Sequence, residues 1–354
     1  MPTNSPILSL LSVISLLSFF IVLLVNKYSH KIGKGILLDE DFDKPQAFHK
    51  FSVARSGGLA GVLSLISFFV LYDLIFGKLL LNFLILSTFF FLLGFLEDIK
   101  LKINPYYRLI LMLVVLLFFV NFFSITIDSL DLMFLSNLMR NSIFEICFII
   151  LCFLFIVNGA NLVDGFNGLL TIHLIIINSI LLYLNLNNGN DDLTLIITAQ
   201  IVILISFLLF NFPKAQMFLG DSGSYMFGSL LAFNVIETNN LNPGVSSFFF
   251  CILLFYLFFE VFFSFFRKLY MKASPLKPDK NHLHMLLYSF LVKSRNFNDC
   301  NYLNSLFINI VYLCLILPGI FFNHSGLICK YWFFALLLIY LIIYFSLYSF
   351  EKKQ

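Results

Sequence analysis

Residues 7–25, ILSLLSVISLLSFFIVLLV, contain no charged side chain and are long enough to decide the fold class. A helix needs about 20 mainly apolar residues to cross the hydrocarbon core of a bilayer. Similar stretches recur along the whole chain of 354 residues, of which 60% are hydrophobic and only 12% are charged. Because a soluble domain carries about 25% charged residues, this composition predicts an integral membrane protein.

Eleven stretches qualify as membrane-spanning helices, and no segment between them forms a separate soluble domain. The stretch 7–25 exceeds the apolar core of a secretory signal and lacks basic residues before it, so we interpret it as a retained helix. We therefore expect an all-α, polytopic fold with one transmembrane domain over residues 1–354. The expected spans are 7–25, 57–76, 79–96, 109–123, 143–160, 168–186, 193–212, 224–237, 245–266, 305–322 and 331–350.

The basic residues are distributed unevenly between the two sets of loops. Nineteen of the 22 Lys and Arg residues follow odd-numbered spans, and the others are Lys78, Arg140 and Lys330. Cytoplasmic loops carry the excess of Lys and Arg. The pattern predicts an outside N-terminus, a cytoplasmic C-terminus and five chemically rich segments at the cytoplasmic face.

Two adjacent carboxylates, Glu97 and Asp98, end the third expected span in the segment GFLEDIK. Adjacent carboxylates repel each other and are costly near a membrane without a cation. The alternative is an exposed acidic turn paired with Lys100 or Lys102.

The segment NGANLVDGFNGLL places Asn158, Asn161, Asp164 and Asn167 three residues apart. On a helical turn this spacing puts the four side chains on one side. Burying several amides and carboxylates costs about 1–3 kcal/mol each unless partners are supplied. A polar ligand would supply partners, and the alternative is a hydrogen-bonded seam between helices.

Asp221 lies in FLGDSGS, just before the expected span 224–237. Free N–H groups at the start of a helix favour an anion, while the carboxylate could hold a divalent cation. The alternative is an ordinary N-cap, a role in which aspartate is common.

Basic and histidine side chains occur in two further loops expected at the same face. His282 and His284 lie in PDKNHLHMLL, and Lys44, His49 and Arg55 lie in KPQAFHKFSVARSGG. Two histidines are weak evidence for zinc, but they could donate to phosphate oxygens. Because cytoplasmic loops are basic in any case, the alternative is a solvated loop.

Taken together, these segments describe a site for a magnesium-bound diphosphate. Mg²⁺ is usually held by one or two carboxylates and by substrate phosphates. Phosphoryl transfer needs mainly positioning and charge neutralisation. The membrane setting indicates a lipid as the second substrate.

The motifs NGANLVDGFNGL, FLGDSGS, KPQAFH with RSGG, and HLH resemble those of the polyprenyl-phosphate N-acetylhexosamine-1-phosphate transferases, glycosyltransferase family 4. The resemblance runs from about residue 40 to 290. It implies transfer of a sugar-1-phosphate from a UDP-linked N-acetylated amino sugar to undecaprenyl phosphate, with Mg²⁺ as cofactor and UMP as product. It also implies a multi-pass protein of the bacterial cytoplasmic membrane. We expect no nucleic-acid partner, and the sequence leaves the oligomeric state open, a homodimer included.

The resemblance also implies roles for individual residues. Asp221 would be the principal magnesium ligand, Asp98 would act on the attacking lipid phosphate, and Glu97 would support the site. The remaining roles are uridine-diphosphate and metal binding by Asn161 and Asp164, the latter also a catalytic residue, substrate binding by Asn167, phosphate contact by His282 and His284, and donor binding by Lys44, His49 and Arg55.

Two departures from the family pattern are Glu97 in place of an aspartate and Met285 in place of a further histidine. The PQxFH and ED forms are closer to the branch that initiates O-antigen, capsule or related glycans than to the peptidoglycan branch. The competing function is a transporter or flippase for a phosphorylated lipid or nucleotide sugar. Transporters place ionisable groups near the bilayer midplane, whereas these spans are nearly free of charge, with Glu145 and Glu260 as exceptions.

Overall fold

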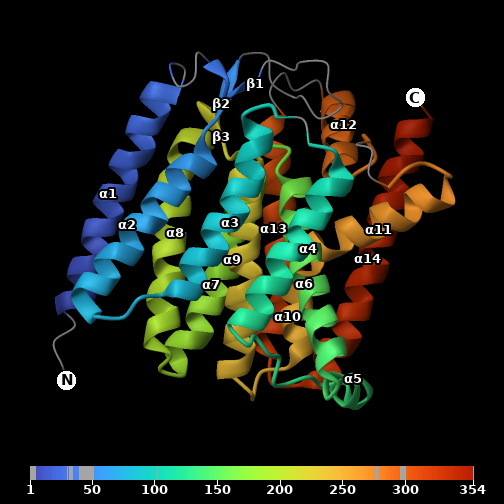
Figure 1. Cartoon of the computed structure of the whole chain (residues 1–354). Coiled ribbons are helices and arrows are strands. Elements are labelled where there is room, and N and C mark those ends of the chain that lie inside the picture. The colour runs from blue at the N-terminus through green and yellow to red at the C-terminus, as the bar shows by residue number, and fades with distance from the viewer. Residues whose placement is uncertain are drawn as a thin grey trace.

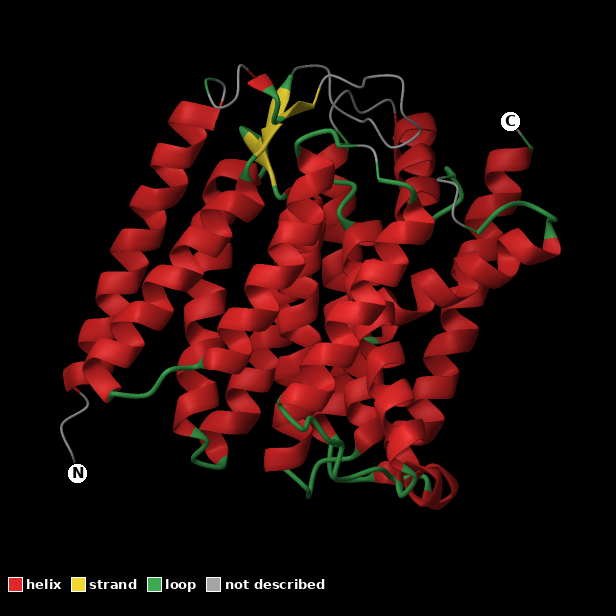
Figure 2. Ribbon diagram, viewed as in Figure 1, coloured by secondary structure: helices red, strands yellow, loops and turns green. Residues whose placement is uncertain are grey.

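The computed structural model describes residues 5–29, 31, 35–39, 52–101, 103–275, 279–295 and 300–353. These residues form a bundle of helices with one small sheet at one end (Figures 1 and 2). The helices are α1 (Ser5–Ser29), α2 (Gly57–Phe76), α3 (Leu81–Asp98), α4 (Pro105–Phe122), α5 (Met133–Met139), α6 (Ser142–Val163), α7 (Leu169–Asn187), α8 (Asp191–Asn211), α9 (Gly220–Leu241), α10 (Ser247–Leu253), α11 (Phe255–Tyr270), α12 (Leu283–Arg295), α13 (Asn301–Phe321) and α14 (Gly326–Lys352).

Each of the eleven expected spans coincides with a helix or a helix pair, but fewer qualify as candidate spans. Nine helices of the described chain are long and apolar enough to cross a membrane, and the count reaches ten if α10 and α11 form one span. This pair is bent by 73°. Helix α9, expected as the eighth span, is not among them because its sequence is rich in Gly, Ser, Thr and Asn.

Helix α9 is polar in sequence and nevertheless lies at the centre of the bundle. Of its 22 residues, all except Asp221, Glu237, Asn240 and Leu241 are buried. It packs against α2, α3, α6 and α7. Its polar residues are paired inside the protein: the Asn234 side chain, for example, donates to Asn178 Oδ1 (3.1 Å) and Gln200 Oε1 (2.8 Å). Such bonds between helices satisfy polar groups that lipid could not.

Local sequence determines where several helices begin. Pro105 is the first residue of α4, where its missing N–H costs no hydrogen bond, and the Asn104 side chain accepts from Tyr106 N (3.0 Å). Asn141 caps α6 in the same way by accepting from Ile143 N (3.0 Å).

A three-stranded sheet, which the sequence did not predict, lies beside the start of α9. Its order is β1 (Leu38–Asp39), β2 (Val53–Arg55) and β3 (Met217–Phe218). Strands β1 and β2 are antiparallel, whereas β2 and β3 are parallel, with Arg55 opposite Phe218. The all-α expectation therefore holds for the bundle, and the sheet brings Arg55 to the segment that contains Asp221.

The start of α1 and the end of α14 lie at opposite ends of the bundle (Figure 1). The sheet, the ends of α3 and α6, the start of α9 and the start of α12 lie at the end where the chain finishes (Figure 1). The five segments expected to meet at one face therefore share one end, as far as they are described. That this end faces the cytoplasm stays a prediction of the charge pattern.

Candidate active site

Asp98 lies at the C-terminal end of α3 and binds the first turn of α9. Its Oδ1 accepts from Asp221 N (2.9 Å), and its Oδ2 accepts from Ser222 N (2.9 Å) and from the Ser222 hydroxyl. The Asp98 side chain is fully buried. The first N–H groups of a helix lack partners within the helix and carry partial positive charge. Asp98 therefore caps α9 from a neighbouring helix, and the expected N-cap alternative for Asp221 is replaced by this arrangement.

Two glycines allow this close contact. Gly220 has φ +77°, and a Cβ there would lie 2.7 Å from Asp98 Oδ2. A Cβ on Gly94, in α3, would lie 2.3 Å from the backbone oxygen of Asp221. A side chain at Gly94 would collide with the backbone of α9, and one at Gly220 would displace the Asp98 carboxylate, so both glycines are needed for this contact.

Asp221 is the more accessible of these two aspartates, with 23% of its side chain exposed. The Asn161 side chain, from the last turn of α6, donates to Asp221 Oδ1 and to Ser224 Oγ, both at 3.0 Å. The second oxygen, Oδ2, lies 3.8 Å from Arg108 Nη1. The structure thus brings Asn161 and Asp221 together from distant parts of the sequence.

Arg108 is a residue of this site that the sequence analysis did not single out. Its Nη1 lies 3.9 Å from Glu97 Oε1, and its guanidinium lies 5.7 Å from the centre of the Tyr225 ring. Among the described residues, neither the buried Glu97 Oε1 nor the buried Tyr225 hydroxyl has a hydrogen-bond partner. The sequence signal for Arg108 was weak. It is one of many Lys and Arg residues in the expected loops, and it differs from the others only by following the LED segment in the same expected loop.

Arg55 approaches the same carboxylates from the sheet. Its Nη2 donates to Asp39 Oδ2 (2.7 Å), its Nε donates to the same oxygen (3.0 Å), and its Nη1 lies 4.0 Å from Asp98 Oδ1. Arg55 therefore lies at the site as expected, held there by Asp39 of β1. Lys44 and His49, expected to bind the donor with Arg55, lie outside the described residues.

Asp164 directly follows α6, where the helix ends at Val163. Burial, followed by the charge of Asp221, raises the pKa of Asp164 to about 8, although Arg55 opposes the shift. Carboxylates that share a site without a cation resist ionisation in this way. Asp164 therefore belongs electrostatically to the group formed by Asp221, Asp98 and Arg55.

The four polar residues of NGANLVDGFNGLL are not on one continuous helix, because Asn158 and Asn161 lie in α6 whereas Asp164 and Asn167 follow its end. Asn158 donates to Leu154 O within its own helix (2.7 Å), and only Asn161 bonds to Asp221. The Asn167 side chain donates to Pro213 O (2.9 Å), in the segment between α8 and β3. The helical spacing expected for all four residues is interrupted because α6 ends at Val163. Asn167 lies beyond this end, and its side chain bonds to Pro213 and not to Asp221.

His282 and His284 lie side by side at the start of α12, with parallel rings 5.5 Å apart. Both ring nitrogens of His282 are engaged, Nδ1 with Glu260 Oε2 (3.2 Å) and Nε2 with Asp279 Oδ1 (3.1 Å). His284 Nδ1 lies 3.3 Å from the Tyr256 hydroxyl, whereas its buried Nε2 has no partner within the described part of the chain. Of the two, only His284 has a ring nitrogen left for a ligand.

No group of three or more His, Cys, Asp and Glu side chains in the described ranges is arranged to hold a metal ion. The residues present nevertheless fit an ion that is held mainly by substrate. Four carboxylates, Glu97, Asp98, Asp164 and Asp221, face the two guanidiniums of Arg55 and Arg108. The excess of negative charge, the accessible Asp221 and the unpartnered Glu97 oxygen suit a divalent cation with few protein ligands.

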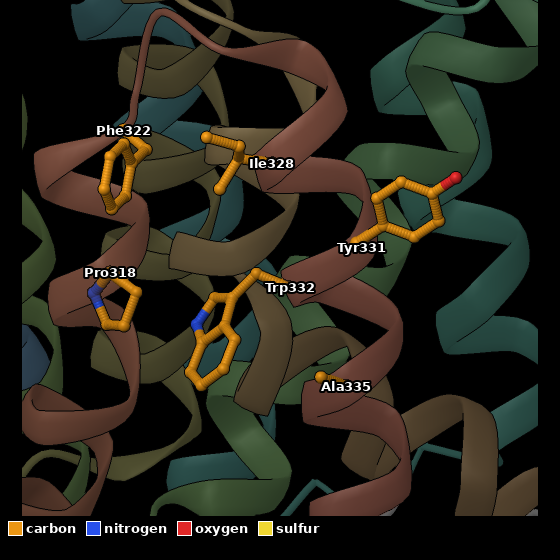
Figure 3. Close-up of a pocket in the computed structure, with 6 residues that line it drawn as sticks. All are labelled: Pro318, Phe322, Ile328, Tyr331, Trp332 and Ala335. Atoms are coloured by element: carbon orange, nitrogen blue, oxygen red, sulfur yellow. The ribbon is translucent and has the colours of Figure 1, made fainter.

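Two cavities identified in the described structure lie apart from these carboxylates. One, of about 480 Å³, is apolar and lies between α13 and α14 (Figure 3), where it is lined by Pro318, Phe322, Ile328, Tyr331, Trp332 and Ala335. The other, of about 290 Å³, lies between α12 and α14 and includes Lys280, Lys293 and Glu351. Neither contains Asp221, so the candidate site is identified by its polar groups and not by an enclosed cavity.

Comparison with known proteins identifies the family. Residues 80–239 match the model of glycosyl transferase family 4, a region that contains Glu97, Asp98, Arg108, Asn161 and Asp221. The chain is 31% identical over 226 residues to the phospho-N-acetylmuramoyl-pentapeptide-transferase of Dictyoglomus turgidum, covering 62% of this chain and 71% of the relative.

Two further relatives match over shorter regions. The undecaprenyl-phosphate alpha-N-acetylglucosaminyl 1-phosphate transferase of Thermotoga maritima is 34% identical over 137 residues, 39% of this chain and 41% of the relative. The phospho-N-acetylmuramoyl-pentapeptide-transferase of Clostridioides difficile is 30% identical over 197 residues, 52% of this chain and 61% of the relative. These two matches span about half of the relatives' length. The family match and the extent of the Dictyoglomus match place this chain in glycosyl transferase family 4.

Proposed function

We propose that this protein transfers a HexNAc-1-phosphate from a UDP-linked amino sugar to undecaprenyl phosphate. An oxygen of the lipid phosphate would attack the phosphorus that carries the sugar. The bond to the second phosphate would break, leaving a lipid diphosphate sugar and UMP. The relatives named above are transferases of a sugar phosphate or a phospho-MurNAc-pentapeptide, and one is named for undecaprenyl phosphate.

The observation that carries this proposal is the contact between α3, α4, α6 and α9 around Asp221. Asn161 donates to its Oδ1, and Arg108 lies 3.8 Å from its Oδ2. Phosphoryl transfer requires groups that position the phosphates and neutralise their charge. Arg108 presents a planar fork that matches phosphate oxygens, and its distances of 3.8 and 3.9 Å to Asp221 and Glu97 leave it free to donate to a ligand.

Asp221 is the residue we expect to hold Mg²⁺, with Asn161 and Asp164 beside it. Bound there, Mg²⁺ would neutralise the diphosphate and polarise its phosphorus–oxygen bonds. Asn161 would keep the Asp221 carboxylate in place. Arg55 and Arg108 would bind phosphate oxygens from two sides.

The contacts of Asp98 favour a positioning role for this residue. Its carboxylate already accepts three hydrogen bonds from α9, whereas Glu97 Oε1 has no partner within the described residues. We therefore assign Asp98 to holding the first turn of α9, which carries Asp221. Glu97 becomes the carboxylate available to the lipid phosphate or to water in the metal's coordination sphere.

The cellular setting follows from the same proposal. Undecaprenyl phosphate is a membrane lipid, and UDP-sugars are soluble. We expect the site end of the bundle to face the cytoplasm of a bacterial inner membrane, in agreement with the basic loops. Initiation of an O-antigen, capsule or related glycan is the pathway role we propose.

The test is a reconstitution with purified protein, undecaprenyl phosphate, Mg²⁺ and a panel of UDP-amino sugars. Formation of UMP together with a lipid diphosphate sugar of the mass expected for one donor supports the proposal. Asp221→Asn should form neither product. Asp192→Asn is the matched control, because Asp192 pairs with Lys78 and lies at the start of α8, away from Asp221. Movement of intact donor or lipid across a vesicle membrane without UMP would indicate the transporter instead.

A further inference from the structure

Glu260 is a buried carboxylate in α11 that the reaction described above does not use. It is 1% exposed. Its Oε2 lies 3.2 Å from His282 Nδ1, and its Oε1 accepts from Leu283 N (3.1 Å) and from the Tyr340 hydroxyl (2.8 Å). One carboxylate thus connects α11, α14, the histidine segment and the first residue of α12.

The contacts of His282 determine its charge. A neutral imidazole has one N–H donor and one acceptor nitrogen, whereas an imidazolium has two donors. His282 Nδ1 faces Glu260 and its Nε2 faces Asp279, and ionised carboxylates can only accept. Burial lowers the pKa of His282, but the hydrogen bonds from the ring to Asp279 and Glu260 outweigh burial and raise it. These two contacts favour the imidazolium form of His282.

This pair of contacts is part of a chain of alternating charges. Arg267 Nη2 lies 2.9 Å from Asp279 Oδ2, so the order is Arg267, Asp279, His282 and Glu260. Other titratable groups near the chain are Lys268 and Tyr256 of α11, His284 of α12, and the α14 tyrosines Tyr340 and Tyr344, the latter beside the Arg267 guanidinium. With all four chain members ionised the charges cancel, which lowers the cost of burying them.

The sharp bend between α10 and α11 brings Glu260 and Arg267 of α11 close to the histidine segment. The two helices differ in direction by 73°, and α11 leaves the main bundle at an angle (Figure 1). Without the contacts of Glu260, the start of α12 would lose a hydrogen bond to Leu283 N and an ion pair to His282.

The contacts of Glu260 and His282 hold the neighbouring His284 in position. Its ring is parallel to that of His282, and a Cβ added at Gly165 would lie 3.8 Å from His284 Nε2. Gly165 directly follows Asp164, which belongs to the candidate active site. Buried polar atoms are nearly always hydrogen-bonded, so the unpartnered Nε2 of His284 indicates a ligand atom near this turn.

We propose that Glu260 is a positioning residue that, by clamping His282 as an imidazolium, aims His284 Nε2 at the phosphate groups bound beside Asp164. The clamp rests on the geometry of the buried chain, and its effect on turnover rests on the proposed function. His282 thereby becomes a structural cation, in contrast to the phosphate contact expected from the sequence.

The test compares Glu260→Gln with the wild type in pH profiles of kcat and KM. Loss of one carboxylate should make His282 lose its proton at a lower pH. The alkaline limb of kcat should therefore move down by about one pH unit, which corresponds to a tenfold change in proton affinity. At pH 7 kcat should fall about tenfold or more while KM for the donor changes less, since a displaced catalytic contact lowers kcat first. Glu260→Asp, which keeps the charge, should have an alkaline limb closer to that of the wild type than Glu260→Gln has.

Glu351→Gln is the matched control. Glu351 also connects α14 to α12, through Lys293 (3.0 Å) and Ser289 (2.6 Å), but it does not contact the histidines. Its pH profile should equal that of the wild type. A Glu260→Gln enzyme with an unshifted alkaline limb, whether its kcat is normal or reduced at every pH, would overturn the proposal. If this variant does not fold, Asp279→Asn must show the same downward shift.

Thermal unfolding provides a readout that does not depend on activity. Stabilisation by the imidazolium is present at low pH and is lost as the pH rises through the raised pKa of His282. The Tm difference between wild type and Glu260→Gln should therefore be larger at pH 6 than at pH 9. Equal differences at both pH values would refute the clamp. If the wild type transfers no sugar phosphate but shows this pH-dependent difference, the clamp stands and the proposed function fails.

Discussion

Replacing Asp98 with asparagine should destabilise the protein as well as inactivate it, because the carboxylate holds the first turn of α9. It accepts from two backbone N–H groups at 2.9 Å each and from the Ser222 hydroxyl, and it is fully buried. An asparagine side chain has one oxygen to accept and turns an NH₂ group toward the remaining donors.

The expected loss of stability in Asp98→Asn follows from these contacts. Hydrogen bonds to a charged group contribute about 1.5–3 kcal/mol each. In Asp98→Asn at least one of the three bonds is lost, because the amide NH₂ group then faces an N–H or O–H donor of α9. We expect the free energy of unfolding to fall by about 3–5 kcal/mol, the range for breaking a buried charged contact. For a chain of this size that corresponds to a fall in Tm of about 4–7 °C. Turnover should fall by about a factor of 10² because Asp221 moves with α9.

The assay is thermal unfolding in detergent together with kcat at saturating substrates, for Asp98→Asn and Glu97→Gln in parallel. Glu97→Gln should lower kcat with little change in Tm, since Glu97 Oε1 has no hydrogen-bond partner in the described ranges. Asp192→Asn removes an exposed ion pair with Lys78, and its amide oxygen can still accept from the Tyr72 hydroxyl, so stability should change by less than about 1 kcal/mol. An Asp98→Asn protein with wild-type Tm and lost activity would refute the positioning role and return Asp98 to direct action on the lipid phosphate.

Three further predictions concern the site and its orientation. Asp221→Asn should reduce turnover by orders of magnitude at ordinary Mg²⁺ concentration while the protein stays folded; near-normal activity would exclude it as the metal ligand. Arg108→Ala should lower kcat/KM by about 10² to 10³, and Arg108→Lys should restore only part of it because lysine lacks the planar fork; an unchanged kcat/KM would remove Arg108 from the site. In a background without reactive cysteines, Asn187→Cys should react with an impermeant thiol reagent in intact cells and Ser274→Cys should not, both positions being exposed at opposite ends; the reverse result would invert the topology.

Much of the fold could be predicted from hydropathy, because lipid requires every spanning segment to satisfy its own backbone. Helix α9 was expected only over 224–237, whereas it extends from Gly220 to Leu241; it lies inside the bundle, where Asn234 bonds to residues of α7 and α8. A hydropathy pattern reports contact with lipid, so the polar ends of this central helix were not included in the expected span. The small sheet was missed because two-residue strands such as Met217–Phe218 have no periodicity to detect.

Part of the composition of the candidate site could be predicted, although Arg108 was missed, but the contacts that distinguish its residues could not. Spacing indicated that Asp221 and Asn161 are functional, and they are in contact. Sequence could not distinguish Asp98 from Glu97, because their environments differ only once α3 packs on α9. Similarly, His282 and His284 are equivalent in the motif, and their difference depends on Glu260, which is 22 residues away in the chain.

The central claim is that the phosphate attached to the sugar moves with it. The most direct measurement uses a UDP-HexNAc labelled with ³²P at the phosphate that carries the sugar, incubated with the purified protein, undecaprenyl phosphate and Mg²⁺. We predict that the label appears in the lipid product and that the released UMP is unlabelled, with no transfer by Asp221→Asn. Label released as UDP, or label that stays in the donor with every amino sugar tested, would contradict the claim.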